Sequence, residues 1–209
     1  MAKKVEVIEI PPLKLEKIEL NIVGNKGRGS GLIVHAWADK AKKEILDKQQ
    51  GKPKQGKVKR DPDRDYREGL YWLDKNGKRI APLKTDPSKH KYFGFPSVAF
   101  KAAAVNVAND VGLPMTFTRR AFFVDGEFVK IEFDELYMRE DMVKIGMGTS
   151  DLRYRGEFVN WRAKLNITFN ASIIQAAQIV NLFNTAGFGV GVGEWRMQKN
   201  GMNGCFSVA

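Results

Sequence analysis

Lysine and arginine side chains crowd into one segment of this 209-residue chain, and their characteristic chemistry is the neutralisation of anions. Between Lys40 and Arg60 stand nine basic residues and two acids, a local net charge of +7 out of +11 for the chain. Such mutually repelling charge is retained where an anion neutralises it, and nucleic acid is the commonest partner of this kind. A solvated loop and an anionic membrane surface are the alternatives. The predicted nucleic-acid contacts here are Lys40, Lys42, Lys43, Lys52, Lys54, Lys57, Lys59 and Arg60.

Aromatic residues beside basic ones suggest a second chemistry, the stacking of side chains on unpaired bases. Tyr154 lies between Arg153 and Arg155, and Trp195 precedes Arg196. Adjacent strand residues point to opposite faces, so these pairs also fit core aromatics with solvated basic neighbours. We predict that Arg153, Tyr154 and Arg155 contact a single strand of nucleic acid.

Catalytic chemistry has little support in the sequence. His35, at the end of the apolar run GLIVH, could act as the general base of a metal-independent ribonuclease, but a structural histidine is commoner in such a place. The HExxH, CxxC, P-loop and GxSxG patterns are absent, and the single Cys205 excludes a disulfide framework or a cysteine-rich zinc site. We therefore predict a protein that is not an enzyme and uses no cofactor or metal.

Composition favours an intracellular globular protein. Hydrophobic residues make up 43% of the chain and charged residues 28%, which is ordinary for a folded domain. No run reaches the roughly 20 apolar residues of a membrane helix, and the N-terminal segment lacks the apolar run of a signal peptide. We expect a cytoplasmic location and no membrane contact.

The positions of apolar residues predict the elements that hold these side chains. Residues 1–12 form a charged arm, and residues 13–209 form one domain with insertions at about 51–92 and 134–160. Alternation predicts strands at 13–24 and 161–169, and the segment GLIVHAW at 31–37 is expected to be a short strand. A basic helix is expected over 38–50, with Ala41, Ile45 and Leu46 facing the protein interior. A short helix is expected within 65–73, where Leu70, Trp72 and Leu73 offer an apolar edge that can dock on the rest of the domain.

Further elements complete an α+β pattern. A helix is predicted at 97–110, and the Asp125-Gly126 dipeptide predicts a hairpin turn. Ser172 is the expected cap of a helix that ends near Ala186, followed by a glycine-rich strand and a terminal strand. The alternate glycines at 187–193 fit either close approach of a partner or close packing of the preceding helix. The predicted fold is a ferredoxin-like or RRM-like antiparallel sheet with helices on one face and a long basic insertion.

Two segments resemble the RAMP superfamily, which includes the repeating backbone subunits of CRISPR effector complexes. The segment FPSVAFKAA at 95–103 is similar to its proline-initiated helix, and GFGVGVG at 187–193 resembles its glycine-rich element. The resemblance implies a ferredoxin-like subunit that binds single-stranded guide RNA along a filament. It further implies backbone contacts by Lys101 and residues 40–60, and a thumb-like insertion at 134–157 that meets a neighbouring subunit.

The sequence therefore predicts a non-enzymatic protein that binds single-stranded RNA or DNA as a repeating subunit of an RNA-guided or phage nucleoprotein assembly. Its expected partners are the nucleic acid and further copies of the chain or other subunits. The alternative is a phage-encoded inhibitor that binds another protein by mimicking a subunit of a nucleic-acid machine.

Overall fold

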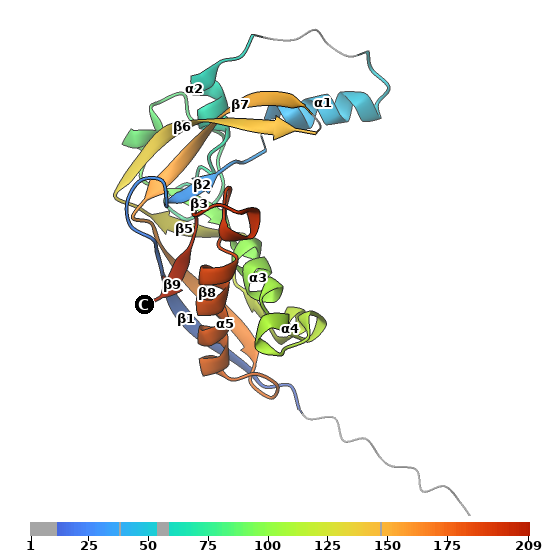
Figure 1. The fold of residues 1–209 in the computed structure, drawn as a ribbon, viewed down its shortest axis with the longest axis vertical. Helices are drawn as coiled ribbons and strands as arrows, with labels where there is room; N and C mark the ends of the chain where they lie inside the picture. Colours follow the sequence, from blue (N-terminus) through green and yellow to red (C-terminus); the bar gives the residue numbers. More distant parts are fainter. Residues whose placement is uncertain (1–11, 38, 54–58, 147) are drawn as a thin grey trace, which may run out of the picture.

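The computed structural model describes residues 12–37, 39–53, 59–146 and 148–209, which form an α+β fold with two antiparallel sheets (Figure 1). The large sheet has the order β3-β5-β8-β1-β9, with β4 also beside β8, and the small sheet has the order β2-β7-β6. The strands are β1 (Leu15–Gly24), β2 (Leu32–Val34), β3 (Phe93–Pro96), β4 (Phe122–Val124), β5 (Phe128–Glu132), β6 (Glu135–Ile145), β7 (Thr149–Val159), β8 (Arg162–Asn170) and β9 (Phe206–Val208). The α-helices are α1 (Asp39–Gln49), α2 (Pro62–Glu68), α3 (Ser97–Asn106), α4 (Met115–Ala121) and α5 (Ala176–Gly189), with 3-10 turns at Pro87–Lys89, Asn109–Val111 and Met197–Lys199.

The large sheet contains the predicted ferredoxin-like core. Its elements follow the chain order β1, α3, β5, β8, α5 and β9. In space β8 lies between β5 and β1, and β1 lies between β8 and β9, all in antiparallel pairs. The chain thus contains two strand–helix–strand units, β1-α3-β5 and β8-α5-β9. A strand of each unit lies between the two strands of the other unit, which is the defining feature of the ferredoxin-like fold.

One face of the large sheet is covered by helices and the other is open. On β1, Leu20 and Ile22 are buried while Glu19 and Asn21 are exposed, as a half-buried strand requires. Helices α3 and α5 pack against each other over the apolar face (Figure 1). The prediction of helices on a single face is therefore confirmed.

The Asp125-Gly126 dipeptide does not form the predicted hairpin. β4 and β5 both pair with β8 and not with each other, so they are successive halves of one interrupted strand. The Asp125 N–H donates to the carbonyl of Asn166, and the Asp125 carboxylate accepts the Thr168 hydroxyl at 2.9 Å. These bonds hold the dipeptide against β8 as a local irregularity, because long-range pairing outweighs the turn preference.

The segment between β5 and β8 is a long β-hairpin, formed by β6 and β7. β7 passes almost directly into β8 through Asn160, whose positive φ of 50° turns the chain from one sheet into the other. The hairpin thus continues away from the ferredoxin-like core and builds the small sheet with β2 (Figure 1). From sequence alone the secondary structure of residues 134–160 is ambiguous, because polar and apolar residues alternate only weakly there.

The segments before β3 divide into a docked part and an exposed part. Leu70, Trp72 and Leu73 are buried against the core, so the predicted docking edge is confirmed. The basic helix is present as α1, but the inward orientation predicted for its apolar residues is wrong. Ile45 and Leu46 are 42% and 50% exposed, because no described element covers them.

Two predicted boundaries of α5 are also corrected. Gln175, not Ser172, caps the helix through a capping box with Gln178, while the Ser172 hydroxyl donates to the carbonyl of Pro12. The helix continues to Gly189, so the predicted glycine-rich strand is replaced by the end of α5 and a loop. We call residues 190–205 the glycine loop.

Substitution of Gly187 tests how closely α5 approaches β9. A Cβ atom at Gly187 would lie 2.0 Å from the carbonyl oxygen of Phe206, so Gly187→Ala should lower the free energy of unfolding by about 1–3 kcal/mol in urea denaturation. Gly189→Ala is the matched control, because its nearest neighbour is 3.9 Å away and alanine favours the helix. Equal stability of the two variants would contradict this packing.

Candidate nucleic-acid interface

A cleft of about 190 Å³ lies between α3, the end of β3, β2 and the glycine loop. Small side chains of α3 form one wall, and backbone of the glycine loop forms the other. Polar groups from different parts of the chain meet at its edge. The lining residues are Ile33, His35, Tyr71, Phe95, Ala99, Ala102, Ala103, Asn106, Val190, Gly191, Val192, Gly193, Glu194 and Arg196.

The glycines of the cleft are required mainly by the chain's own packing. Gly193 has a φ of 82°, and a Cβ there would lie 2.4 Å from the carbonyl oxygen of Ile33. Gly191 has a φ of 68°, and a Cβ there would lie 3.0 Å from the carbonyl oxygen of Gly204. Close packing therefore accounts for these glycines, as it does for Gly187, without any need for a partner.

Two exposed tryptophans stand within two residues in sequence of residues that line the cleft. Trp37 is 65% exposed and lies two residues after His35, while Trp195 is 43% exposed and stands between the lining residues Glu194 and Arg196. Trp195 has a φ of 52°, an unusual backbone conformation for a bulky residue. The N–H of Asn203 donates to the Trp195 carbonyl at 3.1 Å and helps to hold it there.

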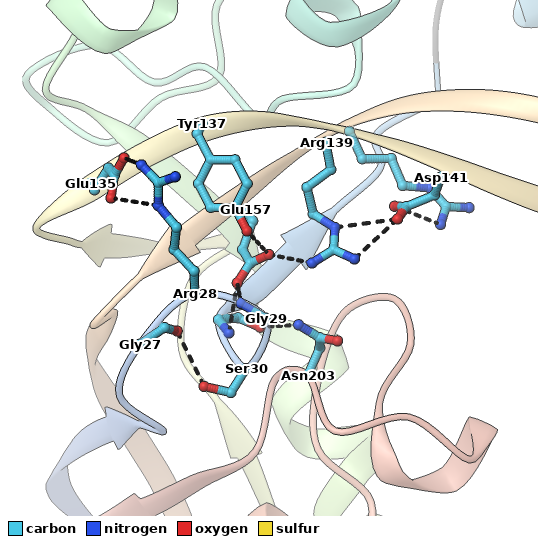
Figure 2. A network of polar contacts seen from close by, with 12 residues as sticks. Gly27, Arg28, Gly29, Ser30, Glu135, Tyr137, Arg139, Asp141, Glu157 and Asn203 are labelled. Atoms are coloured by element: carbon cyan, nitrogen blue, oxygen red, sulfur yellow. Dashed lines mark hydrogen bonds and ion pairs between the residues drawn. The ribbon is translucent and has the colours of Figure 1, made fainter.

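The glycine-containing loop between β1 and β2 encloses a buried carboxylate (Figure 2). Glu157 on β7 is 0% exposed and accepts the N–H groups of Gly29 at 2.7 Å and Gly31 at 3.0 Å. The Tyr137 hydroxyl donates at 2.6 Å, and Arg139 forms an ion pair with the same carboxylate. Burial opposes ionisation, but these hydrogen bonds outweigh it and hold the pKa of Glu157 below its ordinary value. The amide nest of this loop is thus filled by the protein's own anion.

The same loop connects the hairpin to the cleft. The Gly31 carbonyl accepts the N–H of Gly204 at 2.9 Å and lies 3.4 Å from the amide nitrogen of Asn203. The Gly204 carbonyl in turn accepts the N–H of Val192, a cleft residue, at 2.9 Å. Glu157 therefore fixes one wall of the cleft through a continuous chain of hydrogen bonds.

Arg155 is a second buried charge at this junction. It is 3% exposed and lies 3.7 Å from the Asp141 carboxylate and 3.8 Å from the Glu194 carboxylate. Its Nε and Nη1 atoms have no hydrogen-bond partner within the described residues. This burial argues against the predicted contact of Arg155 with nucleic acid, because the side chain already lies between the hairpin and the glycine loop.

His35 lines the cleft as a neutral imidazole. Burial, followed by the positive charges of Arg155 and Arg153, lowers its pKa from the ordinary value. The other histidine, His90, packs against Trp72 and Phe93 instead of lining the cleft. A pair of histidines for acid–base cleavage of RNA is therefore not assembled in the described structure.

The predicted basic contacts are not gathered at one place. Lys40, Lys42 and Lys43 lie on α1, while Lys54 and Lys57 fall outside the described residues. Lys59 is exposed, and Lys101 on α3 is half-buried. Three of the predicted basic residues form salt bridges within the chain: Lys52 with Asp47, Arg60 with Asp65 and Asp151, and Arg153 with Asp151. The side chain of Tyr154 is partly buried and packs against the hydrophobic core.

Sequence reasoning missed Tyr71, Asn106 and Glu194, which the fold brings to the cleft from three distant segments. A signal was available only for Trp195, whose pairing with Arg196 was noted as a possible stacking site. In the described ranges, no three His, Cys, Asp or Glu side chains are grouped to hold a metal ion. No helix there has the length and apolar character needed to cross a membrane.

Comparison with known proteins identifies no family for this chain. Its sequence matches no protein-family model, and a search of curated proteins gives no match either.

The buried carboxylate can be tested by Glu157→Gln. The substitution removes the charge that Arg139 and the loop amides require, so the free energy of unfolding should fall by about 3–5 kcal/mol. The control is Glu135→Gln, whose exposed ion pair with Arg28 is screened by solvent, so this variant should change the free energy of unfolding much less than Glu157→Gln does. Urea denaturation gives both values, and equal losses would contradict the central role of Glu157.

Proposed function

We propose that this protein binds single-stranded nucleic acid without catalysing a reaction on it, as a subunit of a larger nucleoprotein assembly. The observation that carries the proposal is the combination of a net charge of +11 with two exposed tryptophans, Trp37 and Trp195, each within two residues in sequence of the lining of a cleft. Lysines supply affinity for phosphates, and an exposed indole stacks on a base that has no partner.

The basic helix is placed to serve this binding. α1 begins at Asp39, two residues after Trp37, so its charges start next to one of the exposed tryptophans. Lys43 and Lys48 on this helix are exposed. A strand whose base stacks on Trp37 can therefore place its neighbouring phosphates along α1.

The open face of the large sheet is less suited to nucleic acid. Its central strands present Lys17, Glu19 and Asn21 from β1 and Lys164 and Asn166 from β8, with no aromatic side chain among them. The Lys164 amine pairs with Glu19 at 2.9 Å, which neutralises charge across the strands. An RRM stacks bases on aromatics at its central strands, so this chain favours the cleft on its helical side instead.

Assembly with further subunits is supported by the small sheet. β6 is its edge strand, and Met138, Met142 and Leu152 on the hairpin are 41%, 64% and 43% exposed. An edge that no described strand pairs with, beside apolar side chains, suits a protein contact. The resemblance to the RAMP superfamily adds the expectation that the assembly is RNA-guided and that the strand is RNA.

Electrostatic binding can be tested by the salt dependence of affinity. Filter binding of a labelled single strand should weaken linearly on a log–log plot against salt, because bound lysines release counterions. The variant with Lys43→Ala and Lys48→Ala should weaken all sequences alike and reduce the slope by about one for each lysine. Lys164→Ala is the control and should leave the slope unchanged, and a flat wild-type response would overturn the proposal.

Stacking can be tested by tryptophan fluorescence. Trp72 and Trp161 are 0% exposed, so quenching by a single strand should come from Trp37 and Trp195. The double variant Trp37→Phe, Trp195→Phe should lose most of the quenching and bind several-fold more weakly, since stacking contributes about 1–3 kcal/mol per base. Undiminished quenching in this variant would exclude both residues from the interface.

A further inference from the structure

We infer that the cleft is a pocket for one unpaired nucleobase and that Glu194 selects a base with an exocyclic amino group, so that cytosine binds better than uracil. This inference rests on the proposed function and adds a preference for particular bases to it.

The size and walls of the cleft suit a single flat ring. Its volume of about 190 Å³ is below the roughly 300–1,000 Å³ of pockets for larger ligands. Ala99, Ala102 and Asn106 follow each other at helical spacing and line one wall. Because alanine extends no further than Cβ, a planar group can lie against α3, with Phe95 and Val192 adding apolar surface.

The edge of the cleft carries groups that can read the edge of a base. Tyr71, His35 and Asn106 offer hydrogen-bonding groups, and the carboxylate of Glu194 offers acceptor oxygens. This mixture of apolar walls and a few convergent polar groups is the pattern of a selective small-ligand site.

Glu194 is fixed in position while its carboxylate stays available. Its backbone N–H donates to the Ile33 carbonyl at 2.9 Å, which ties the residue to β2. The carboxylate is 3.8 Å from Arg155, an ion pair too long to be a hydrogen bond, and it accepts no hydrogen bond from the described residues. Its oxygens can therefore accept a donor that enters the cleft.

A base fits this chemistry better than a phosphate does. Glu194 would repel a phosphate, and Arg155 already lies between two carboxylates, Asp141 and Glu194. The lining cation Arg196 is also engaged, because its guanidinium donates to the Gly193 carbonyl at 2.9 Å and to the Gln198 side chain at 3.1 Å. A carboxylate accepts the N4 amino group of cytosine, whereas uracil presents an acceptor, O4, at the same position. Cytosine and uracil therefore differ in the exocyclic group that Glu194 would contact.

The backbone of Trp195 gives independent support. A non-glycine residue in the left-handed region is strained, and such strain concentrates at ligand sites. Here the strained residue follows Glu194 directly and has an exposed indole. The same loop can thus present an acceptor to one base and a stacking surface to the next.

The inference is tested by measuring the affinity of cytidine and uridine oligomers of equal length for the wild-type protein near neutral pH. The two pyrimidines carry the same backbone charge, so the ratio of their dissociation constants isolates the base contact. We expect about fivefold tighter binding of the cytidine oligomer, the lower end of discrimination by a good side-chain contact.

Two variants locate the preference. Glu194→Gln should bring the ratio close to one, because the glutamine amide both donates and accepts. Ala102→Leu fills the cleft from an exposed helical position, so it should also remove the preference. Their controls are Glu132→Gln on the open face of the large sheet and Ala177→Leu on the exposed side of α5, and both should keep the wild-type ratio.

The outcomes separate this inference from the proposed function. Salt-dependent binding with equal affinity for both oligomers, or a preference unchanged in Glu194→Gln and Ala102→Leu, would overturn the base pocket and leave the proposed function standing. Failure of the wild-type protein to bind either oligomer would overturn both.

Discussion

The buried carboxylate of Glu157 is the interaction on which the relative position of the two sheets depends. It lies on β7 of the small sheet and binds the amides of the loop that enters β2 from the large sheet (Figure 2). Removing a carboxylate from water costs several kcal/mol, and hydrogen bonds from charged and neutral donors must offset that cost. Glu157 meets this requirement with Tyr137, Arg139 and two backbone amides, so the junction has one favourable geometry.

Backbone hydrogen bonds connect the loop around Glu157 to the cleft. Gly31 receives one hydrogen bond from Gly204, which receives another from Val192, so the glycine loop is held in register with the loop around Glu157. Arg155 adds an electrostatic link between Asp141 on the hairpin and Glu194 at the cleft. A cleft lined by small residues would otherwise have little to fix its width, because alanine and glycine make few contacts of their own.

Basic residues therefore have two separate tasks in this protein. Arg139 and Arg155 are partly or fully buried and pair with carboxylates, so they shape the junction of the two sheets. Lys43 and Lys48 of α1 are exposed, so their charge is directed to the solvent. Our functional proposals assign the phosphates to the second group and the bases to the cleft that the first group supports.

The sequence by itself determined the α+β class and most strands, because a strand with one buried face shows its alternation along β1 and β8 whatever lies next to it. It also located the excess charge and the docking edge at Leu70, Trp72 and Leu73. Tertiary structure decided that β4 and β5 share one neighbour, since the turn preference of Asp125-Gly126 is weaker than pairing with β8. It also decided that Arg155 is buried, that Trp195 is exposed, and that Tyr71, Asn106 and Glu194 meet at one cleft. These facts depend on contacts between residues far apart in the chain, and local periodicity carries no information about such contacts.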